Sequence, residues 1–283
     1  MIQAKKKVSV SDVIAMKGAE KISVLTAYDY STSLICDRAG VDVLLVGDSA
    51  GMVVLGYSST VPVGMQEMIM FCGAVARGAK RAMIVGDMPF GAYQPNASVA
   101  VENAVQLIKA GCNAVKLEGG TELFGTIKAI VDAGIPVMGH IGLKPQTASL
   151  WEGYKLQGKT KESAAELVGD AKALEKSGVF GIVLEMVTSE VANAITKSVS
   201  VPTIGIGSGA GCDGQVLVLH DMLGIYEDIR PKFVKRYAEL SKSIFDAVSS
   251  YTREVKTARF PAEPNTFHMS PDELDKFKKM KKK

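Results

Sequence analysis

The sequence predicts an α/β protein folded as a single (β/α)₈ barrel, with a helix before the barrel and an extension after it. Short apolar runs bounded by glycine recur along the chain, as expected for strands buried on both faces. Helical stretches alternate with these runs, and strand–helix alternation is typical of a parallel sheet. Eight such strands fit within 283 residues, the number that closes a barrel. An open doubly wound sheet is the alternative, but it usually has a Gly-rich turn after its first strand, where this chain has Tyr28-Asp29-Tyr30.

The elements are predicted from periodicity, capping residues and glycine stops. The expected strands are Ile22–Ala27, Val43–Ser49, Ala82–Gly86, Ala114–Glu118, Pro136–Ile141, Gly181–Glu185, Val201–Gly205 and Val216–Leu219. The expected helices are Ser9–Lys17, Ser31–Ala39, Met65–Arg77, Ser98–Ala110, Thr121–Ala133, Thr160–Lys176, Ser189–Val199, Pro231–Val248 and a short one from Pro271.

We expect one domain over residues 1–283: an N-terminal helix in 1–20, the barrel in 21–250 and an extension in 251–283 that wraps the surface and ends in a Lys-rich tail. The first helix could plug one end of the barrel. The connection 142–159 is longer than usual, which indicates a lid or a subunit contact.

Charge and composition exclude several classes of protein. Six of the 33 basic residues fall between positions 276 and 283, so the rest of the chain has 27 basic against 30 acidic residues. A mildly acidic body argues against nucleic-acid binding. No apolar run is long enough to cross a membrane, and the first residues lack the apolar region of a signal peptide. The four widely spaced cysteines favour reduced thiols, so we expect a cytoplasmic protein.

Acidic residues follow four of the expected strands. Asp48, Asp87, Glu118 and Glu185 each stand at the carboxyl end of an apolar run, and His140 ends the fifth strand. The carboxyl ends of all barrel strands open on one face, where active sites are built. We therefore expect these side chains to form one site.

A cation is the simplest way to hold several carboxylates together. Each acid taken alone could be an ordinary helix cap. Like charges in a partly dry site, however, repel by about 4 kcal/mol per close pair at an effective dielectric near 20. Either some acids are protonated or a cation compensates them. Oxygen ligands point to Mg²⁺, with Asp48, Asp87 and Glu118 as ligand candidates, directly or through water.

Three further side chains at this end leave alternatives open. Lys116 shares a face with Glu118. It could neutralise the acids, bind an anionic substrate or, if desolvated, form a Schiff base. Glu185 stands between Leu184 and Met186, and an apolar setting would raise its pKa and make it a general base. It could also cap the next helix, and His140 could be a hydrogen-bonded core residue.

A glycine-rich segment follows the seventh strand. The string Gly205-Ile206-Gly207-Ser208-Gly209 is compatible with phosphate binding, which barrels often place after strands seven and eight. Such a string is weak evidence, because glycines also permit close backbone approach by any ligand.

Several strings of this chain resemble the ketopantoate hydroxymethyltransferase family. The strings run in order along nearly the whole chain, from about Ser23 to His268. They are Thr26-Ala27-Tyr28-Asp29-Tyr30, Val46-Gly47-Asp48-Ser49, Lys116-Leu117-Glu118-Gly119-Gly120, Gly139-His140-Ile141-Gly142-Leu143 with Pro145-Gln146, Gly205-Ile206-Gly207-Ser208-Gly209 and Asp213-Gly214-Gln215. The serine of the fifth string departs from the family's usual alanine.

The resemblance implies a Mg²⁺-dependent barrel enzyme of pantothenate biosynthesis. It would transfer a hydroxymethyl group from the co-substrate 5,10-methylenetetrahydrofolate to 3-methyl-2-oxobutanoate, giving 2-dehydropantoate. By position, the resemblance makes Glu185 the catalytic base. His140 and Asp29, which stand at strand ends on the same mouth of the barrel, are candidates to lie behind the residues that touch substrate and metal. The matched metal ligands are Asp48, Asp87 and Glu118. The matched keto acid contacts are Asp48, Ser49, Asp87 and Lys116. The family also implies a cytoplasmic homodecamer.

Two other functions are weighed against this one. A lyase or mutase of the isocitrate lyase and phosphonomutase type would also use Mg²⁺ and an enolate. Such enzymes usually carry a reactive cysteine beside the metal, and no cysteine here follows a strand end in that way. A non-catalytic ligand-binding barrel is the alternative from a different class, and the retained acids argue against it.

Overall fold

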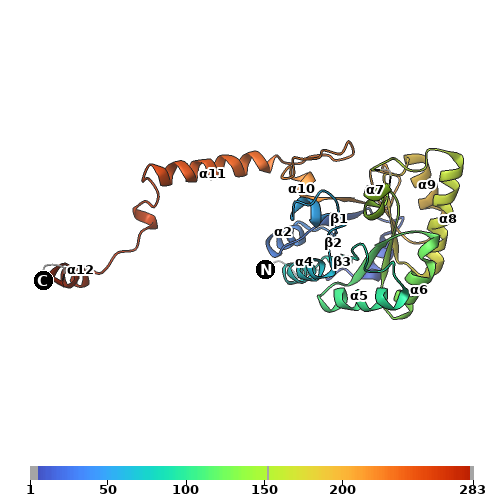
Figure 1. The fold of residues 1–283 in the computed structure, drawn as a ribbon, viewed down its shortest axis with the longest axis horizontal. Coiled ribbons are helices and arrows are strands. Elements are labelled where there is room, and N and C mark those ends of the chain that lie inside the picture. Colours follow the sequence, from blue (N-terminus) through green and yellow to red (C-terminus); the bar gives the residue numbers. More distant parts are fainter. Residues whose placement is uncertain (1–5, 152, 281–283) are drawn as a thin grey trace.

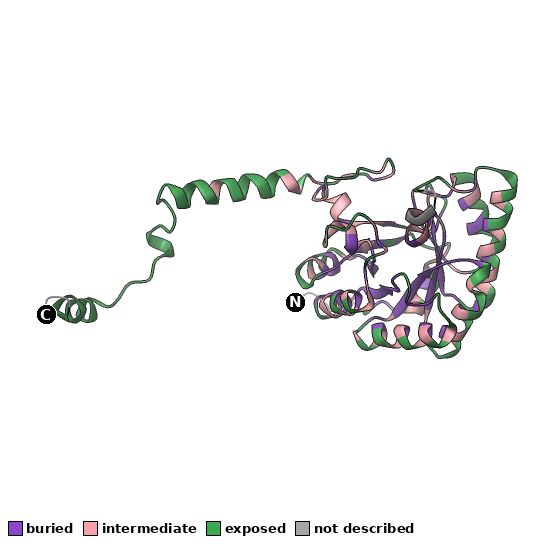
Figure 2. Cartoon of the chain, viewed as in Figure 1, coloured by how far each residue is buried: buried purple, intermediate pink, exposed green. Residues whose placement is uncertain are grey.

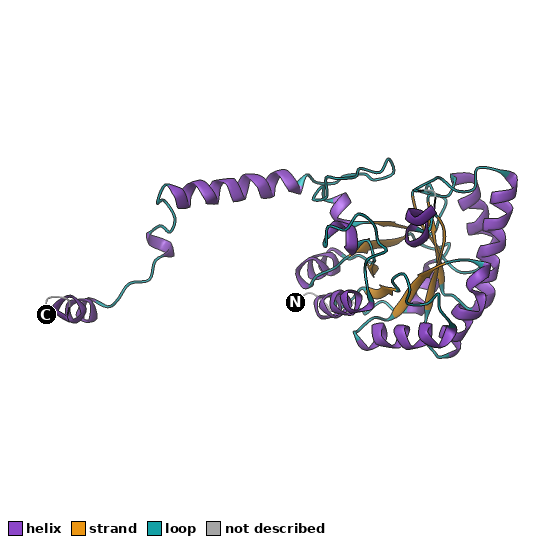
Figure 3. Cartoon of the chain, viewed as in Figure 1, coloured by secondary structure: helices purple, strands orange, loops and turns teal. Residues whose placement is uncertain are grey.

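The computed structural model describes residues 6–151 and 153–280, and the first five residues and the last three lysines of the tail lie outside it. Eight parallel strands close into a barrel in chain order, with β8 pairing back onto β1. Helices surround the strands on the outside (Figures 1 and 3). The predicted (β/α)₈ barrel is therefore confirmed.

The strands agree closely with the sequence prediction. They are β1 (Ile22–Thr26), β2 (Val43–Val46), β3 (Met83–Asp87), β4 (Ala114–Glu118), β5 (Val137–Gly142), β6 (Gly181–Glu185), β7 (Thr203–Ile206) and β8 (Gly214–Leu217). Each strand alternates between a side chain that points into the barrel and one that points out to the helices.

The long helices also follow the prediction, and the structure adds the short elements α3, α10 and η2, which were not predicted. The segment 121–133 divides into a 3₁₀ turn and a helix, the connection after β5 contains α7, and the last long helix starts later than expected. The helices are α1 (Val10–Met16), α2 (Tyr30–Ala39), α3 (Ala50–Val53), α4 (Met65–Gly78), α5 (Ala97–Lys109), η1 (Thr121–Leu123), α6 (Phe124–Asp132), α7 (Pro145–Trp151), α8 (Lys161–Ser177), α9 (Ser189–Ser198), α10 (Leu219–Met222), α11 (Leu240–Lys256), η2 (Glu263–Asn265) and α12 (Pro271–Met280).

The hydrophobic core has two layers separated by the sheet. Outward residues such as Leu44 and Ile182 pack against the surrounding helices, and inward residues such as Leu45 and Val183 fill the barrel. This division explains why the strands read as continuous apolar runs, because both faces are dry (Figure 2).

Helix α1 closes the amino-terminal end of the barrel, as the sequence suggested. Ser9 caps this helix, and its hydroxyl accepts a hydrogen bond from Asp12 N at 3.2 Å. Val13 is fully buried and, with Val8, joins the inward-facing core cluster. The opposite end of the barrel, at the carboxyl ends of the strands, is open and can hold a functional site.

The C-terminal extension does not wrap the barrel, so this part of the prediction is wrong. Helices α11 and α12 project away from the barrel (Figure 1), and neither helix has a buried residue. Their amphipathic pattern predicts a helix but does not specify which surface it packs on. The domain boundary at residue 250 stays a prediction.

We predict that Val13→Ala destabilises the protein by about 2 kcal/mol, because the side chain fills the barrel end beneath α1. Ile14→Ala is the matched control, since Ile14 is 42% exposed on the same helix. Urea unfolding followed by circular dichroism measures both variants. Equal stabilities would show that α1 does not close the barrel.

Candidate active site

Strand parity brings the predicted residues into one cavity. Asp87, Lys116 and Glu118 share the inward parity of buried barrel residues on their strands, as do His140 and Glu185. The loop after β2 adds a further carboxylate, Asp48, and the hydroxyl of Ser49. All of these side chains line a single cavity of about 390 Å³ at the carboxyl end of the barrel.

A buried ion pair lies at the inner end of this cavity. Lys116 Nζ lies 2.7 Å from Asp87 Oδ1 and 2.8 Å from Oδ2, and both side chains are almost inaccessible to solvent. The backbone N of Asp48 donates to Asp87 Oδ2 at 3.3 Å, which links the loop after β2 to the carboxylate of Asp87. Lys116 is therefore bound as an ammonium group, and this geometry does not support a Schiff-base role.

Gln146 links the acids to one another, a role that the sequence analysis did not assign. Its Nε2 donates to Asp48 Oδ2 at 2.9 Å and to the carbonyl of Met88 at 2.9 Å, and its backbone N donates to Glu118 Oε2 at 3.1 Å. Tyr93 O–H donates to Gln146 Oε1 at 2.7 Å. Gln146 stands in one of the family-like strings, but a neutral amide carries no sequence signal of this kind.

His140 lies between two carboxylates. Its Nδ1 is 3.6 Å from Glu118 Oε1 and its Nε2 is 3.4 Å from Glu185 Oε2. Within the described residues, neither imidazole nitrogen has a hydrogen-bond partner, and Glu118 Oε1 has none either. Burial, with the charge of Lys116, lowers the pKa of His140 well below its usual range, so the ring is neutral.

Burial changes the protonation of the acids. It raises the pKa of Asp48 to about 7, with the negative charge of Asp87 adding to the effect, and it raises the pKa of Glu185 to about 7. The pKa of Glu118 also rises, mainly through burial. Burial alone would lower the pKa of Lys116, but Asp87 and the other carboxylates outweigh it and raise that pKa. The inner end is therefore one charge-coupled cluster around a cationic lysine.

The outer part of the cavity is apolar and comes from loops. Tyr154 and Met52 contact each other across it, from the connection after β5 and from α3. Tyr28 O–H lies 2.8 Å from Ser49 Oγ at its edge. Its other walls are Val53, Tyr226, Ile229 and Phe233. The long connection after β5 therefore contributes to the cavity, as a lid would.

The carboxylate oxygens at the inner end of the cavity could hold a divalent cation. Among the described residues, no group of three or more His, Cys, Asp or Glu side chains is arranged to hold a metal ion by itself. Asp48 and Asp87 both offer carboxylate oxygens to the cavity, and Glu118 Oε1 is buried without a hydrogen-bond partner within the described chain. Mg²⁺ typically takes one or two carboxylates and completes its shell with substrate and water oxygens. The residues present fit that mode of binding.

The structure does not support a site role for Asp29 or phosphate binding by the glycine segment after β7. Asp29 lies outside the cavity and caps α2, with Oδ1 accepting a hydrogen bond from Thr32 N at 2.9 Å. The glycine segment after β7 is filled by protein. A Cβ on Gly207 would meet the Phe233 ring at 2.9 Å, and one on Gly209 would meet Ser189 Oγ at 2.5 Å. These glycines allow close packing, which leaves no reason to assign them a phosphate.

Comparison with known proteins agrees with this architecture. Residues 7–263 match the family model described as ketopantoate hydroxymethyltransferase. A 3-methyl-2-oxobutanoate hydroxymethyltransferase of Nitrosopumilus maritimus is 57% identical over 95% of this chain and 97% of its own. Two solved structures share the fold. Phosphoenolpyruvate phosphomutase from Streptomyces platensis has a TM-score of 0.61 at 15% identity, covering 97% of this chain and 98% of its own. Phosphonopyruvate hydrolase in complex with oxalate and Mg²⁺ has a TM-score of 0.59 at 14% identity, covering 96% of each chain.

The fold and the acidic cavity define a (β/α)₈ barrel enzyme with its active site at the carboxyl ends of the strands. The chain belongs to the ketopantoate hydroxymethyltransferase family. It transfers a hydroxymethyl group to 3-methyl-2-oxobutanoate and forms ketopantoate (2-dehydropantoate). The lyase or mutase alternative is not favoured, since those enzymes share the fold at low sequence identity. All four cysteines are buried, and none lines the cavity.

We predict that Gln146→Ala lowers kcat/KM for the keto acid about 10–100-fold, because Asp48 and Glu118 lose the side chain that orients them. Gln94→Ala is the matched control, since Gln94 reaches the site through a single 3.5 Å contact with Gln146. Steady-state kinetics measures both variants. Equal effects would remove Gln146 from the positioning role.

Proposed function

We propose that the enzyme removes a proton from carbon 3 of 3-methyl-2-oxobutanoate to form an enolate, which then attacks a one-carbon unit carried by tetrahydrofolate. The observation that carries this proposal is the difference between Glu185 and the other acids. The carboxylates of Asp48, Asp87 and Glu118 each accept a hydrogen bond, whereas the carboxylate of Glu185 accepts none within the described chain.

Glu185 has the properties of a general base. Its side chain keeps 17% exposure, its closest polar contact is the 3.4 Å approach of His140, and it faces the cavity. Burial raises its pKa to about 7, so the carboxylate and the acid are both populated near neutrality. A base with such a pKa can accept a proton from a carbon acid and return it, a role typically worth 10²–10⁴ in rate.

The inner cluster is suited to bind the keto acid's oxygens. We propose that Asp48 and Asp87 hold Mg²⁺, with Glu118 as a further ligand or a water-mediated one. When bound, the ion supplies Lewis-acid stabilisation of negative charge on the substrate oxygens. Lys116 pairs with Asp87 and adds a fixed positive charge, while Ser49 offers a hydroxyl beside Asp48. His140, held neutral by burial, separates Glu118 from Glu185.

The outer, apolar part of the cavity is our candidate for the one-carbon carrier. The whole cavity exceeds what a small branched keto acid needs and falls within the range of about 300–1,000 Å³ typical of larger ligands. Tyr154 is 46% exposed, and with Tyr226 and Phe233 it offers aromatic faces to a flat pterin ring. This placement puts the carrier next to Glu185 and the keto acid.

The location and assembly of the enzyme follow from its family. Within the described residues, no helix is long and apolar enough to span a membrane. We propose a cytoplasmic homo-oligomer, with the decamer implied by the family as the expected size.

We predict that Glu185→Gln slows exchange of the carbon 3 hydrogen of the keto acid by at least about 100-fold, because the amide cannot accept the proton. Exchange into D₂O in the presence of Mg²⁺ and without folate, followed by NMR, isolates this step. Glu190→Gln, an exposed acid in the first turn of α9, is the matched control. Since the carboxylate form is the active one and its pKa is about 7, wild-type exchange should rise with pH through about 7 and then level off. Normal exchange in Glu185→Gln would assign the base to another residue.

We predict that Asp87→Asn weakens Mg²⁺-dependent binding of the keto acid by at least about 100-fold, because the site loses one of its two adjacent carboxylates. Isothermal titration with and without EDTA measures this binding. Asp132→Asn, an exposed acid of α6, is the matched control. Unchanged affinity in Asp87→Asn, or wild-type binding that ignores EDTA, would contradict the proposed metal site.

A further inference from the structure

Asp221 is a charged side chain of the cavity that the proposed proton transfer and metal binding do not use. It lies on α10, just after β8, and lines the same cavity as the inner acids. Its charge acts on Tyr226 in the apolar outer wall and on Tyr28 at the cavity edge. The inner acids raise one another's pKa, whereas the pKa of Asp221 depends on burial and on Arg236. Asp221 therefore belongs to the outer part of the cavity and not to the inner cluster.

Within the described residues, the carboxylate of Asp221 forms no ion pair and accepts no hydrogen bond. The nearby guanidinium of Arg236 is already engaged, since it donates to Glu239 Oε2 at 2.9 Å and to the carbonyl of Tyr226 at 3.4 Å. Burial raises the pKa of Asp221 to about 6, so the group is mostly ionised near neutrality. An ionised carboxylate in a partly dry setting is unfavourable without hydrogen-bond donors. A ligand that brings such donors would therefore be favoured here.

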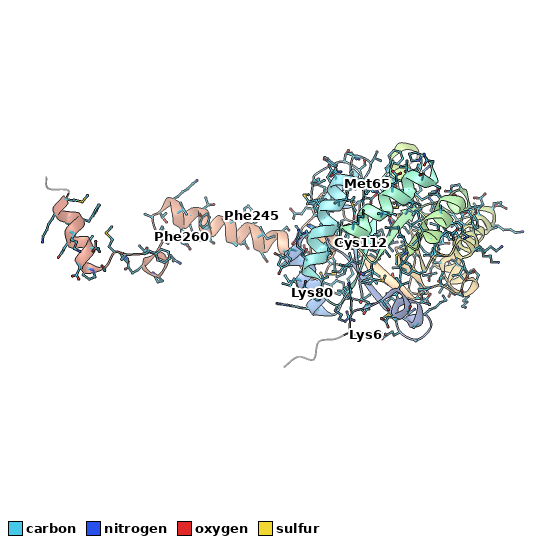
Figure 4. All side chains as sticks on the ribbon, turned by 90° about the horizontal axis from the view of Figure 1, so that it is seen from below. Lys6, Met65, Lys80, Cys112, Phe245 and Phe260 are labelled. Atoms are coloured by element: carbon cyan, nitrogen blue, oxygen red, sulfur yellow. The ribbon has the colours of Figure 1, made fainter. Side chains whose placement is uncertain are left out.

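The position of Asp221 is fixed by the barrel and is open to the cavity. Leu219 N donates to Thr26 Oγ1 at 2.9 Å, which ties the start of α10 to β1. The C-terminal extension does not close over the cavity, because Phe245 and Phe260 lie away from the barrel (Figure 4) and no residue of α11 or α12 lines the cavity. A side chain held on a rigid element in this way is suited to select one edge of a ligand.

We propose that Asp221 recognises the pterin ring of the one-carbon carrier by accepting hydrogen bonds from its N3–H and its 2-amino group. This inference rests on the proposed binding of the carrier in the outer part of the cavity. The two donors are neighbours on one edge of the ring, so a single carboxylate accepts from both, and charge-assisted bidentate pairs are strong. Tyr154 and Phe233 offer their rings to the faces of the pterin. The keto acid has only acceptor oxygens and cannot replace the pterin at Asp221.

Asp221→Asn and Glu227→Gln on the full-length protein test this role as a matched pair. Each converts one acid after β8 to its amide, but Glu227 is exposed, accepts a hydrogen bond from Ser241 Oγ at 2.9 Å and does not line the cavity. We expect Asp221→Asn to weaken tetrahydrofolate binding at least about tenfold, measured by anaerobic isothermal titration, because the charge and one of its acceptors are lost. Glu227→Gln should bind like the wild type.

Exchange of the carbon 3 hydrogen of the keto acid, which needs no carrier, checks the inner cluster in the same variants. We expect Asp221→Asn to exchange like the wild type, which also shows that the variant is folded. Loss of exchange would place Asp221 in the chemistry of the keto acid and would overturn the proposal.

A tetrahydrofolate analogue with a methyl group in place of the 2-amino group tests the contact itself. We expect the wild type to prefer tetrahydrofolate over this analogue at least about tenfold. Asp221→Ala should bind the two ligands about equally, because no carboxylate remains to accept from the amino group. If Asp221→Ala keeps the wild-type preference, the residue has only a structural role and the proposal is wrong.

Tyr154→Ala separates this inference from the proposed function on which it rests. Tyr154 is 46% exposed and lines the outer part of the cavity, so its truncation should weaken tetrahydrofolate binding if the carrier lies there. Weaker binding in Tyr154→Ala with wild-type binding in Asp221→Asn would overturn the role of Asp221 and leave the carrier site in place. Wild-type binding in both variants would overturn the carrier site as well.

Discussion

The site depends on one buried ion pair, between Lys116 on β4 and Asp87 on β3. Three other acids, Asp48, Glu118 and Glu185, lie near this pair in a cavity whose surroundings are largely dry. Without the ammonium group, ionised carboxylates at this density would repel one another strongly. With it, the Asp87 carboxylate is paired directly with a cation. Burial raises the pKa of the three other acids, Asp48, Glu118 and Glu185.

This charge balance separates two functions within one cavity. The acids next to Lys116 are held by hydrogen bonds from Gln146 and from the backbone, and they present oxygens to a metal and to the keto acid. Glu185 lies across His140, too far from the lysine for a direct contact, and its carboxylate is free to take a proton. Pairs of carboxylates whose environments differ in this way are typical of acid–base catalysis.

The interior of the barrel is filled by side chains, but part of its outer wall is exposed. The amino-terminal end of the barrel is closed by α1 and the mouth is lined by loops, but on β1 and β8 the outward residues Ser23 and Gln215 are exposed. The amphipathic helix α11 of the same chain points away from the barrel and has no buried residue.

The sequence alone determined the barrel, because apolar runs ending in acids are local patterns and strand parity then fixes which side chains meet. Asp48, Asp87, Lys116, Glu118 and Glu185 were identifiable in this way. Only the tertiary structure showed the properties that depend on contacts between side chains. It assigned Gln146 as the link between acids, since a neutral amide has no sequence signature, and it left Asp29 as a helix cap, since position at a strand end does not fix side-chain direction. It also showed that the C-terminal extension projects away from the barrel. The sequence could not predict this, because an amphipathic pattern specifies an apolar face of a helix but not the surface on which that face packs.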